Sequence, residues 1–321
     1  MELYQTLEFV NKPVSRLVFG CANELINGGT AVDDVMDAAF AAGINTFDTA
    51  ENYGKSECVL GSWIARRGLR DRVVIISKGC HPYGRSRVAP EDLQSDIEKS
   101  FVQLQTDYID VYLLHRDDTN VPVGPLVETL NAYHKAGKIG AFGGSNWTHQ
   151  RIREANDYAT AHNLVPFTIS SPNYGLANQL GDPWGGNCVT ISGPQNEEAR
   201  AFYRETGMPV LAYSSLGHGL FSGKVKGDDM EGAKAILDGG GIRGYWFEEN
   251  FERLRRAECL AKELGSTVPQ VALAWIFHQN LNVLGVVSVS SAGRIASNMA
   301  ALQLPLTDAQ CRWLNLELDS L

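Results

Sequence analysis

Four side chains of types that can move a proton stand at or just beyond the ends of short apolar runs. In chain order they are Asp48, Tyr53, Lys78 and His115. A tyrosine has an ordinary pKa near ~10, so it exchanges protons poorly at neutral pH unless a nearby ammonium lowers that pKa. A carboxylate would keep a lysine charged and in place, and an imidazole could orient a carbonyl oxygen. The four types together suit a proton donor for the alkoxide that forms when an aldehyde or ketone is reduced.

Each of these residues also has an ordinary explanation when it is taken alone. An aspartate near a strand end often caps a helix or forms a turn, a lysine there is usually solvated, and a lone histidine is usually structural. The chemical interpretation therefore requires a fold that brings the strand ends together. The set also contains no electron source, so a hydride cofactor must bind beside it.

Runs rich in β-branched residues alternate with helical patterns along the whole chain. The predicted strands cover residues 16–20, 44–49, 72–78, 108–115, 139–145, 166–170, 209–214 and 282–288. The predicted helices cover 32–42, 90–104, 123–135, 151–162, 195–205, 251–264 and 269–278. The Gly-rich stretch 238–250 predicts an inserted loop that acts as a mobile flap.

Strand and helix alternation predicts a parallel sheet, and the number of strands decides its form. Eight strands in 321 residues favour an α/β fold of the (β/α)8 TIM-barrel type, one domain over 1–321. A doubly wound sheet would usually have fewer strands, and no GxGxxG follows a strand here. In a (β/α)8 barrel the active site lies at the C-terminal ends of the strands, which is where the four side chains stand.

Composition excludes several classes of protein. The formal net charge of -9 argues against a general nucleic-acid binder or a protein of anionic membranes. Six scattered cysteines without a CxxC pair predict idle thiols in a reducing compartment and no metal site. The first residues predict no signal peptide, and no apolar run approaches ~18 residues, so we expect a cytoplasmic protein.

Several stretches, taken in order, resemble the aldo-keto reductase superfamily. They are "GINTFDTAENYG", "VIISK", "DVYLLH", "GGSNW" and "AYSSLGHGLFSGK". The resemblance implies an NAD(P)H-dependent enzyme in which Tyr53 is the general acid/base and Lys78 lowers its pKa. It further implies that Asp48 holds Lys78 and that His115 orients the substrate.

The resemblance also implies a set of cofactor contacts. Ser145 and Asn146 would hold the nicotinamide carboxamide, and Tyr213 would stack on the ring. The remaining positions that match the family's cofactor contacts are Gly20, Cys21, Ser171, Leu216, Gly219, Ser222, Lys224, Ser290, Ser291, Arg294 and Asn298. Many relatives have a glutamine where this chain has Ser171, whose shorter side chain puts cofactor affinity in doubt.

Arg294 favours NADPH, because its planar fork suits a 2′-phosphate. Many relatives also carry a lysine where this chain has Ser288, so NADH stays open as the alternative cofactor.

The loop 172–190 combines Trp184 with several amides and a carboxylate, which suits a sugar-like carbonyl substrate. Asn173 is a further candidate substrate contact, and Trp147 could line either the pocket or the core. The alternative is a surface loop whose Trp184 packs on the barrel.

Two other functions remain open. The first is a nucleotide-binding sensor subunit of the same fold with little turnover. The second is a metal-dependent barrel enzyme with His115, Asp117 and Asp118 as ligands, although "HRDD" lacks partner ligands at other strand ends.

Overall fold

Eight parallel strands form a closed barrel in the computed structural model, which describes residues 1–289 and 291–321. The hydrogen-bonded order is β10-β3-β4-β5-β6-β7-β8-β9. Their bounds are β3 (Leu17–Gly20), β4 (Thr46–Asp48), β5 (Val74–Gly79), β6 (Ile109–Leu114), β7 (Ile139–Ser145), β8 (Ile169–Ser171), β9 (Val210–Ala212) and β10 (Val283–Ser288). This confirms the predicted (β/α)8 class and all eight predicted strands.

The chain divides into two compact units. One contains Leu3–Ser171 and Ser288–Ala292, and the other contains Met1–Glu2, Pro172–Val287 and Gly293–Leu321. We call them the N-terminal unit and the C-terminal unit.

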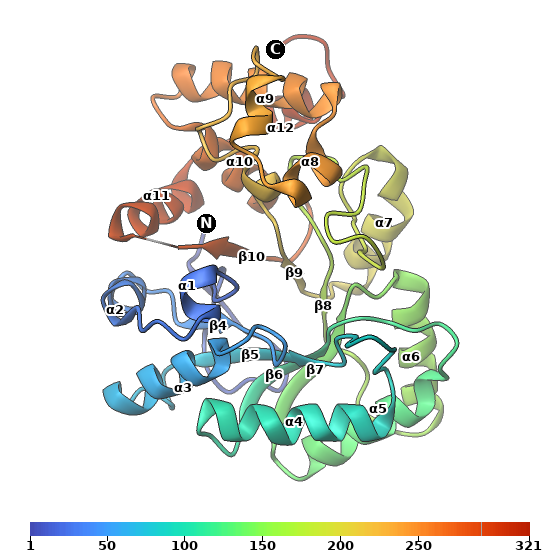
Figure 1. The fold of residues 1–321 in the computed structure, drawn as a ribbon. Coiled ribbons are helices and arrows are strands. Elements are labelled where there is room, and N and C mark those ends of the chain that lie inside the picture. Colours follow the sequence, from blue (N-terminus) through green and yellow to red (C-terminus); the bar gives the residue numbers. More distant parts are fainter. Residues whose placement is uncertain (290) are drawn as a thin grey trace. The chain divides into compact units, whose positions relative to one another are not determined.

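The N-terminal unit carries the strands β3 to β8 and the helices that cover them (Figure 1). These helices are α1 (Glu24–Asn27), α2 (Asp33–Ala41), α3 (Ser56–Arg67), α4 (Pro90–Leu104), α5 (Val123–Lys135) and α6 (His149–Ala161). A short antiparallel pair, β1 (Tyr4–Gln5) and β2 (Val14–Ser15), precedes them and was not among the predicted strands. The register aligns Asp48 with Ile76 and Lys78 with Leu113, so the polar residues at the C-terminal ends of β4, β5 and β6 lie at one edge.

Helix α4 shows why local sequence specifies these elements well. Pro90 stands in its first turn with Glu91 and Asp92, where a missing N–H does no harm and negative charge favours the helix dipole. Its buried side chains Leu93 and Ile97 recur on one face. The observed bounds match the predicted 90–104.

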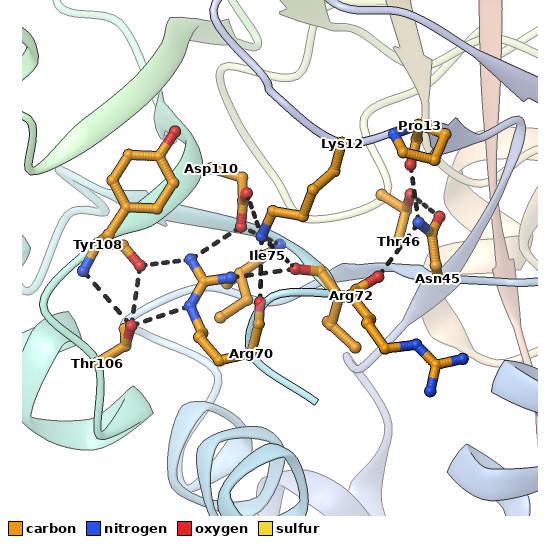
Figure 2. A network of polar contacts seen from close by, with 11 residues as sticks. Lys12, Pro13, Asn45, Thr46, Arg70, Arg72, Ile75, Thr106, Tyr108 and Asp110 are labelled. Carbon is orange, nitrogen blue, oxygen red and sulfur yellow. Dashed lines mark hydrogen bonds and ion pairs between the residues drawn. The ribbon is translucent and has the colours of Figure 1, made fainter. Parts of the chain in front are cut away.

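At the opposite, N-terminal end of β5 and β6, an ionic network holds the strands (Figure 2). The carboxylate of Asp110 is fully buried and pairs with Lys12 at 2.6 Å and Arg70 at 2.9 Å. It also accepts a hydrogen bond from the Ile75 backbone N–H at 2.9 Å. Arg70 donates further to the Tyr108 carbonyl at 2.6 Å. A buried carboxylate without these partners would be strongly unfavourable, so this end of the barrel serves stability.

The C-terminal unit holds β9 and β10, which pair in parallel with Val283 opposite Val210. Its helical elements are η1 (Pro194–Asn196), α7 (Glu197–Thr206), η2 (Gly217–Gly219), η3 (Gly232–Ala235), α8 (Gly239–Tyr245), α9 (Glu248–Glu263), α10 (Val268–Phe277), α11 (Ala292–Gln303) and α12 (Asp308–Leu314). Across the described residues, no helix has the length and hydropathy that a membrane crossing needs.

The prediction of a flexible loop over 238–250 is wrong. This stretch forms α8 and the start of α9. Glycine disfavours helix, but the Asp238 side chain caps α8 by accepting from the Gly241 N–H at 2.7 Å, and Tyr245 at its end is fully buried. Capping and tertiary packing outweigh the low helix propensity of three consecutive glycines.

Candidate active site

A buried ion pair joins the ends of β4 and β5. The Lys78 Nζ donates to the Asp48 Oδ1 at 2.6 Å and to the Thr49 carbonyl at 2.9 Å, and both paired side chains are almost wholly buried. Burial alone would lower the pKa of Lys78, but Asp48 and Tyr53 outweigh it and raise that pKa. Lys78 is therefore a fixed positive charge at neutral pH.

Tyr53 lies over this ion pair. The Lys78 Nζ is 5.1 Å from the centre of the Tyr53 ring, and the ring meets His115 edge-on with centroids 5.5 Å apart. Burial raises the pKa of Tyr53, and the charges of Lys78 and Arg116 offset this only in part. The expected net lowering of this pKa by Lys78 is thus not seen, because the loss of water around the phenol is the larger effect. The phenol is protonated at neutral pH, as a proton donor must be.

His115 follows β6 and is held by its backbone N–H, which donates to the Gly79 carbonyl at 2.7 Å. Burial lowers the pKa of His115 well below its ordinary value, and the neighbouring Lys78, Arg116 and His81 lower it further. The imidazole is therefore neutral and can donate one hydrogen bond. Its Nδ1 atom is buried and has no hydrogen-bond partner among the described residues.

The loop from β4 to α3 is tied to β5 on both sides of Tyr53. The Glu51 backbone N–H donates to the Lys78 carbonyl at 2.9 Å, and its carboxylate binds the Tyr83 hydroxyl at 2.8 Å and pairs with Lys99. Beyond Tyr53, the Glu57 Oε1 accepts from the Ser77 hydroxyl at 2.5 Å. These contacts hold the loop that carries Tyr53. They also provide partners for two buried acids, Glu51 and Glu57.

The side chains predicted to hold the carboxamide lie beside His115. The Asn146 Nδ2 donates to the His115 carbonyl at 3.3 Å and to the Ser145 Oγ at 3.2 Å. Ser145 in turn donates to the Ser171 carbonyl at 3.1 Å. Asn146 has a positive φ of 58°, a conformation uncommon outside glycine and often found at functional sites.

Gly20 and Cys21 end the first barrel strand in the same N-terminal unit. Gly20 is aligned with Asp48 across β3 and β4, and the Cys21 N–H donates to the Asp48 carbonyl at 2.8 Å. The backbone at this strand end is therefore held directly beside the ion pair.

In the C-terminal unit, Tyr213 follows β9 and forms part of an aromatic group. The Trp184 ring lies 5.8 Å from that of Tyr213 and 5.3 Å from that of His218. Trp184 remains 50% exposed. The Asp182 carboxylate holds the loop by accepting from the N–H groups of Trp184 and Cys188 at 2.8 and 2.9 Å.

The other predicted cofactor contacts occupy two segments. Leu216, Gly219, Ser222 and Lys224 form the turn after β9, in which Gly219 has a φ of 99° and Lys224 is exposed. Arg294 is exposed on α11, Asn298 on the same helix is buried, and Ser291 precedes the helix. Ser290 lies outside the described residues.

Two candidate substrate contacts lie in the interior. Trp147 is fully buried, and its indole N–H donates to the Arg116 carbonyl at 3.2 Å. Asn173 is also buried; its amide donates to the Tyr213 carbonyl and the Tyr245 hydroxyl and accepts from Thr190. These bonds hold both side chains within the protein, and their role as substrate contacts stays a prediction.

Sequence reasoning missed two polar residues beside the predicted four. His81 lies with its ring 5.0 Å from that of His115, and the charge of Arg116 acts on Tyr53, His115 and His81. Both follow strands directly, in "SKGCH" and "LLHR", so their position after β5 and β6 was the available signal.

The alternative metal site is not formed. Asp117 binds the Arg151 guanidinium at 2.9 Å and Asp118 accepts from Asn120, so their carboxylates have other partners. Within residues 1–289 and 291–321, no group of three or more His, Cys, Asp or Glu side chains is arranged to hold a metal ion.

A comparison with known protein families agrees with this geometry. The sequence model described as the Aldo/keto reductase family matches residues 20–315.

Proposed function

The chain belongs to the aldo/keto reductase family, and we propose that it reduces an aldehyde or ketone to the alcohol, taking hydride from NADPH and a proton from Tyr53. The observation that carries the proposal is the Tyr53 phenol placed over the buried Lys78–Asp48 pair and against a neutral His115. This arrangement provides a protonated donor with a fixed positive charge beside it.

Each of the four side chains has a distinct part in the proton step. Tyr53 donates its phenolic proton to the carbonyl oxygen as negative charge develops there. Lys78 stabilises the phenolate that remains, and Asp48 keeps Lys78 charged and in place. The neutral His115 donates a hydrogen bond that orients the same oxygen. The nicotinamide, when bound, supplies the hydride that goes to carbon.

The chemistry of the side chains supports a nicotinamide dinucleotide as the cofactor. Ser145 and Asn146 offer the hydroxyl and amide groups that a carboxamide needs, and Tyr213 offers a ring for stacking. The turn at Gly219, Ser222 and Lys224 would line the pyrophosphate. Arg294 supports NADPH over NADH through a 2′-phosphate, although Ser288 is exposed where many relatives carry a lysine.

The substrate is proposed to be sugar-like. Support comes from Trp184, whose half-exposed indole stands beside Tyr213 on a loop stiffened by Asp182. An exposed aromatic face suits the C–H face of a polyhydroxylated ligand. We place the reaction in the cytoplasm, which the six free cysteines support.

Replacement of the proton donor tests the proposal. Tyr53→Phe is expected to lower kcat for carbonyl reduction by at least ~100-fold, because general acid catalysis contributes about that much. The measurement is oxidation of NADPH at 340 nm with a panel of aldehydes, ketones and ketoses. Titration of the variant with NADPH is expected to give the wild-type Kd, which separates chemistry from binding. Turnover by the variant close to that of the wild type would refute the role of Tyr53.

A further inference from the structure

Arg116 is a partly buried arginine next to the proposed catalytic histidine. It directly follows His115, and its carbonyl is anchored by the buried Trp147 indole at 3.2 Å. The guanidinium is partly buried and donates to the His115 carbonyl at 3.3 Å. Its positive charge lowers the pKa of Tyr53, of His115 and of His81, so the guanidinium lies near all three side chains.

The carboxylates that follow Arg116 in the chain have other partners. Asp117 makes a two-point contact with the Arg151 guanidinium, through Nε at 2.9 Å and Nη2 at 3.1 Å. The Asp118 Oδ1 accepts from the Asn120 side chain at 2.9 Å. Glu51, whose charge also acts on His81, pairs with Lys99 and Tyr83.

Arg116 therefore differs from two other arginines of the same unit. Arg70 pairs with Asp110, and Arg151 pairs with Asp117. Arg116 forms no ion pair with any carboxylate in the described part of the chain. A partly buried cation without a counter-ion is unfavourable, and a bound anion would remove that penalty.

We propose that Arg116 is the recognition residue for a carboxylate or phosphate group on the carbonyl substrate. The inference rests on the proposed carbonyl reduction and narrows its substrate class to aldehydes or ketones that carry an anionic group. The guanidinium fork binds the anionic group while the carbonyl oxygen faces Tyr53 and His115. The His81 Nδ1 lies 3.1 Å from the Pro82 carbonyl oxygen, so that nitrogen carries the proton of the neutral ring.

Paired substrates that differ only in charge test this assignment. The probes are 4-carboxybenzaldehyde with its methyl ester, and glyceraldehyde 3-phosphate with glyceraldehyde. The wild type is expected to favour one or both anionic members by roughly 10- to 100-fold in kcat/KM, the range of a hydrogen bond to a charged group. The pair that shows the preference distinguishes a carboxylate from a phosphate substrate.

Variants assign the preference to Arg116. Arg116→Gln is expected to abolish it while neutral substrates are still reduced, and Arg116→Lys to retain a part through its charge alone. Arg66→Gln on the surface of α3 removes the same unit of charge and is expected to keep the full preference. Equal rates for charged and neutral members in the wild type, or a preference that survives Arg116→Gln, would overturn the proposal. An equal loss for both members in Arg116→Gln would also overturn it, by showing a purely electrostatic effect on Tyr53.

A binding assay separates this inference from the proposed reaction. Benzoate and inorganic phosphate are titrated against the NADPH-treated protein while Tm is followed. At least one of them is expected to raise Tm in the wild type and in Arg66→Gln, and neither in Arg116→Gln. No reduction of the neutral probes would contradict the proposed function, whereas no anion-dependent shift, or an equal shift in Arg116→Gln, would contradict the role of Arg116.

Discussion

At the residue scale, burial and charge act against each other on the pKa of Tyr53, the proposed proton donor. Burial raises the pKa of Tyr53, while Lys78 and Arg116 lower it. In the proposed reaction, this phenol keeps its proton until negative charge develops on a substrate oxygen beside it. Once the proton has left, Lys78 stabilises the phenolate most strongly, because the attraction between an ammonium and a phenolate is strong where water is excluded.

Glu57 gives a prediction for stability against pH. It is fully buried at the start of α3, and burial raises its pKa from the ordinary 4.5 to about 7 despite the hydrogen bond from Ser77. Between these two values the folded protein holds a proton that the unfolded chain has released. The free energy of unfolding should therefore fall as pH rises across this window, by at most about 1.4 kcal/mol per pH unit from this group, and level off above it.

Glu57→Gln is expected to flatten that decline, because an amide does not ionise. Urea unfolding of both proteins at pH 5, 6, 7 and 8 measures it. Glu205→Gln, an exposed position on α7, is expected to keep the wild-type slope. Identical slopes for wild type and Glu57→Gln would show that Glu57 does not ionise in this range.

The sequence predicted that the four proposed catalytic residues would lie together, but it did not predict all of their neighbours. Asp48, Lys78 and His115 end apolar runs, so the fold alone predicts their meeting. Arg116 was not identified because nothing in "HRDD" shows that Arg151, distant in sequence, takes up Asp117. The net direction of the Tyr53 pKa also depends on burial, which no spacing of residues reveals.

At the scale of elements, the loop 172–190 is held by hydrogen bonds of its own side chains, and Trp184 is an exposed aromatic residue on it. The side chains of Asp182 and Asn173 form hydrogen bonds within the loop and to Tyr245. Trp184 is half exposed beside Tyr213. Trp184→Ala is expected to raise the KM for polyhydroxylated carbonyls severalfold, since stacking on an aromatic ring contributes about 1 kcal/mol. The KM for small aldehydes such as propanal should stay within about twofold.

Steady-state kinetics with a ketose and with propanal, compared between wild type and variant, measures this difference. Leu180→Ala, another exposed apolar position of the loop, serves as the matched control and should leave both KM values unchanged. Unchanged kinetics in Trp184→Ala would show that the tryptophan only packs on its own unit.

Elements were predictable where local signals agreed with tertiary packing. The barrel strands are short β-branched runs buried on both faces, and α4 and α5 have the predicted bounds. Helix α8 was missed because its glycines argue against helix, and only the Asp238 cap and burial favour it. Helix α3 was also missed, although two arginines followed by a glycine, Arg66 to Gly68, are a typical signal for a helix end. In the structure Gly68 is the C-cap, with a φ of 61°.

At the scale of the whole molecule, the surplus of negative charge contrasts with the anionic ligands proposed. The formal net charge is -9, and the proposed ligands are NADPH and an anionic carbonyl compound. Positive side chains near the ligands must therefore offset the negative net charge of the chain. We assign that role to Lys224, Arg294 and Arg116. The assignment of residues 1–321 to a single domain stays a prediction.

Cofactor choice follows from the same argument. NADPH is expected to bind about tenfold or more tightly than NADH, since a 2′-phosphate on Arg294 makes charge-assisted hydrogen bonds. Arg294→Gln should reduce the ratio of the two Kd values towards one and leave the NADH value unchanged. Quenching of tryptophan fluorescence on titration provides both constants. Tighter binding of NADH by the wild type would contradict the role of Arg294.

The most direct test of the proposed hydride transfer uses deuterium-labelled NADPH. NADPH deuterated stereospecifically at C4 of the nicotinamide, prepared as both isomers, is incubated with the protein and a reducible aldehyde, and the alcohol is examined by mass spectrometry and NMR. We predict one deuterium on the carbinol carbon from one isomer only, and none from either isomer with Tyr53→Phe over the same time. Alcohol without deuterium from either isomer, or no alcohol with any carbonyl tried, would contradict hydride transfer at this site.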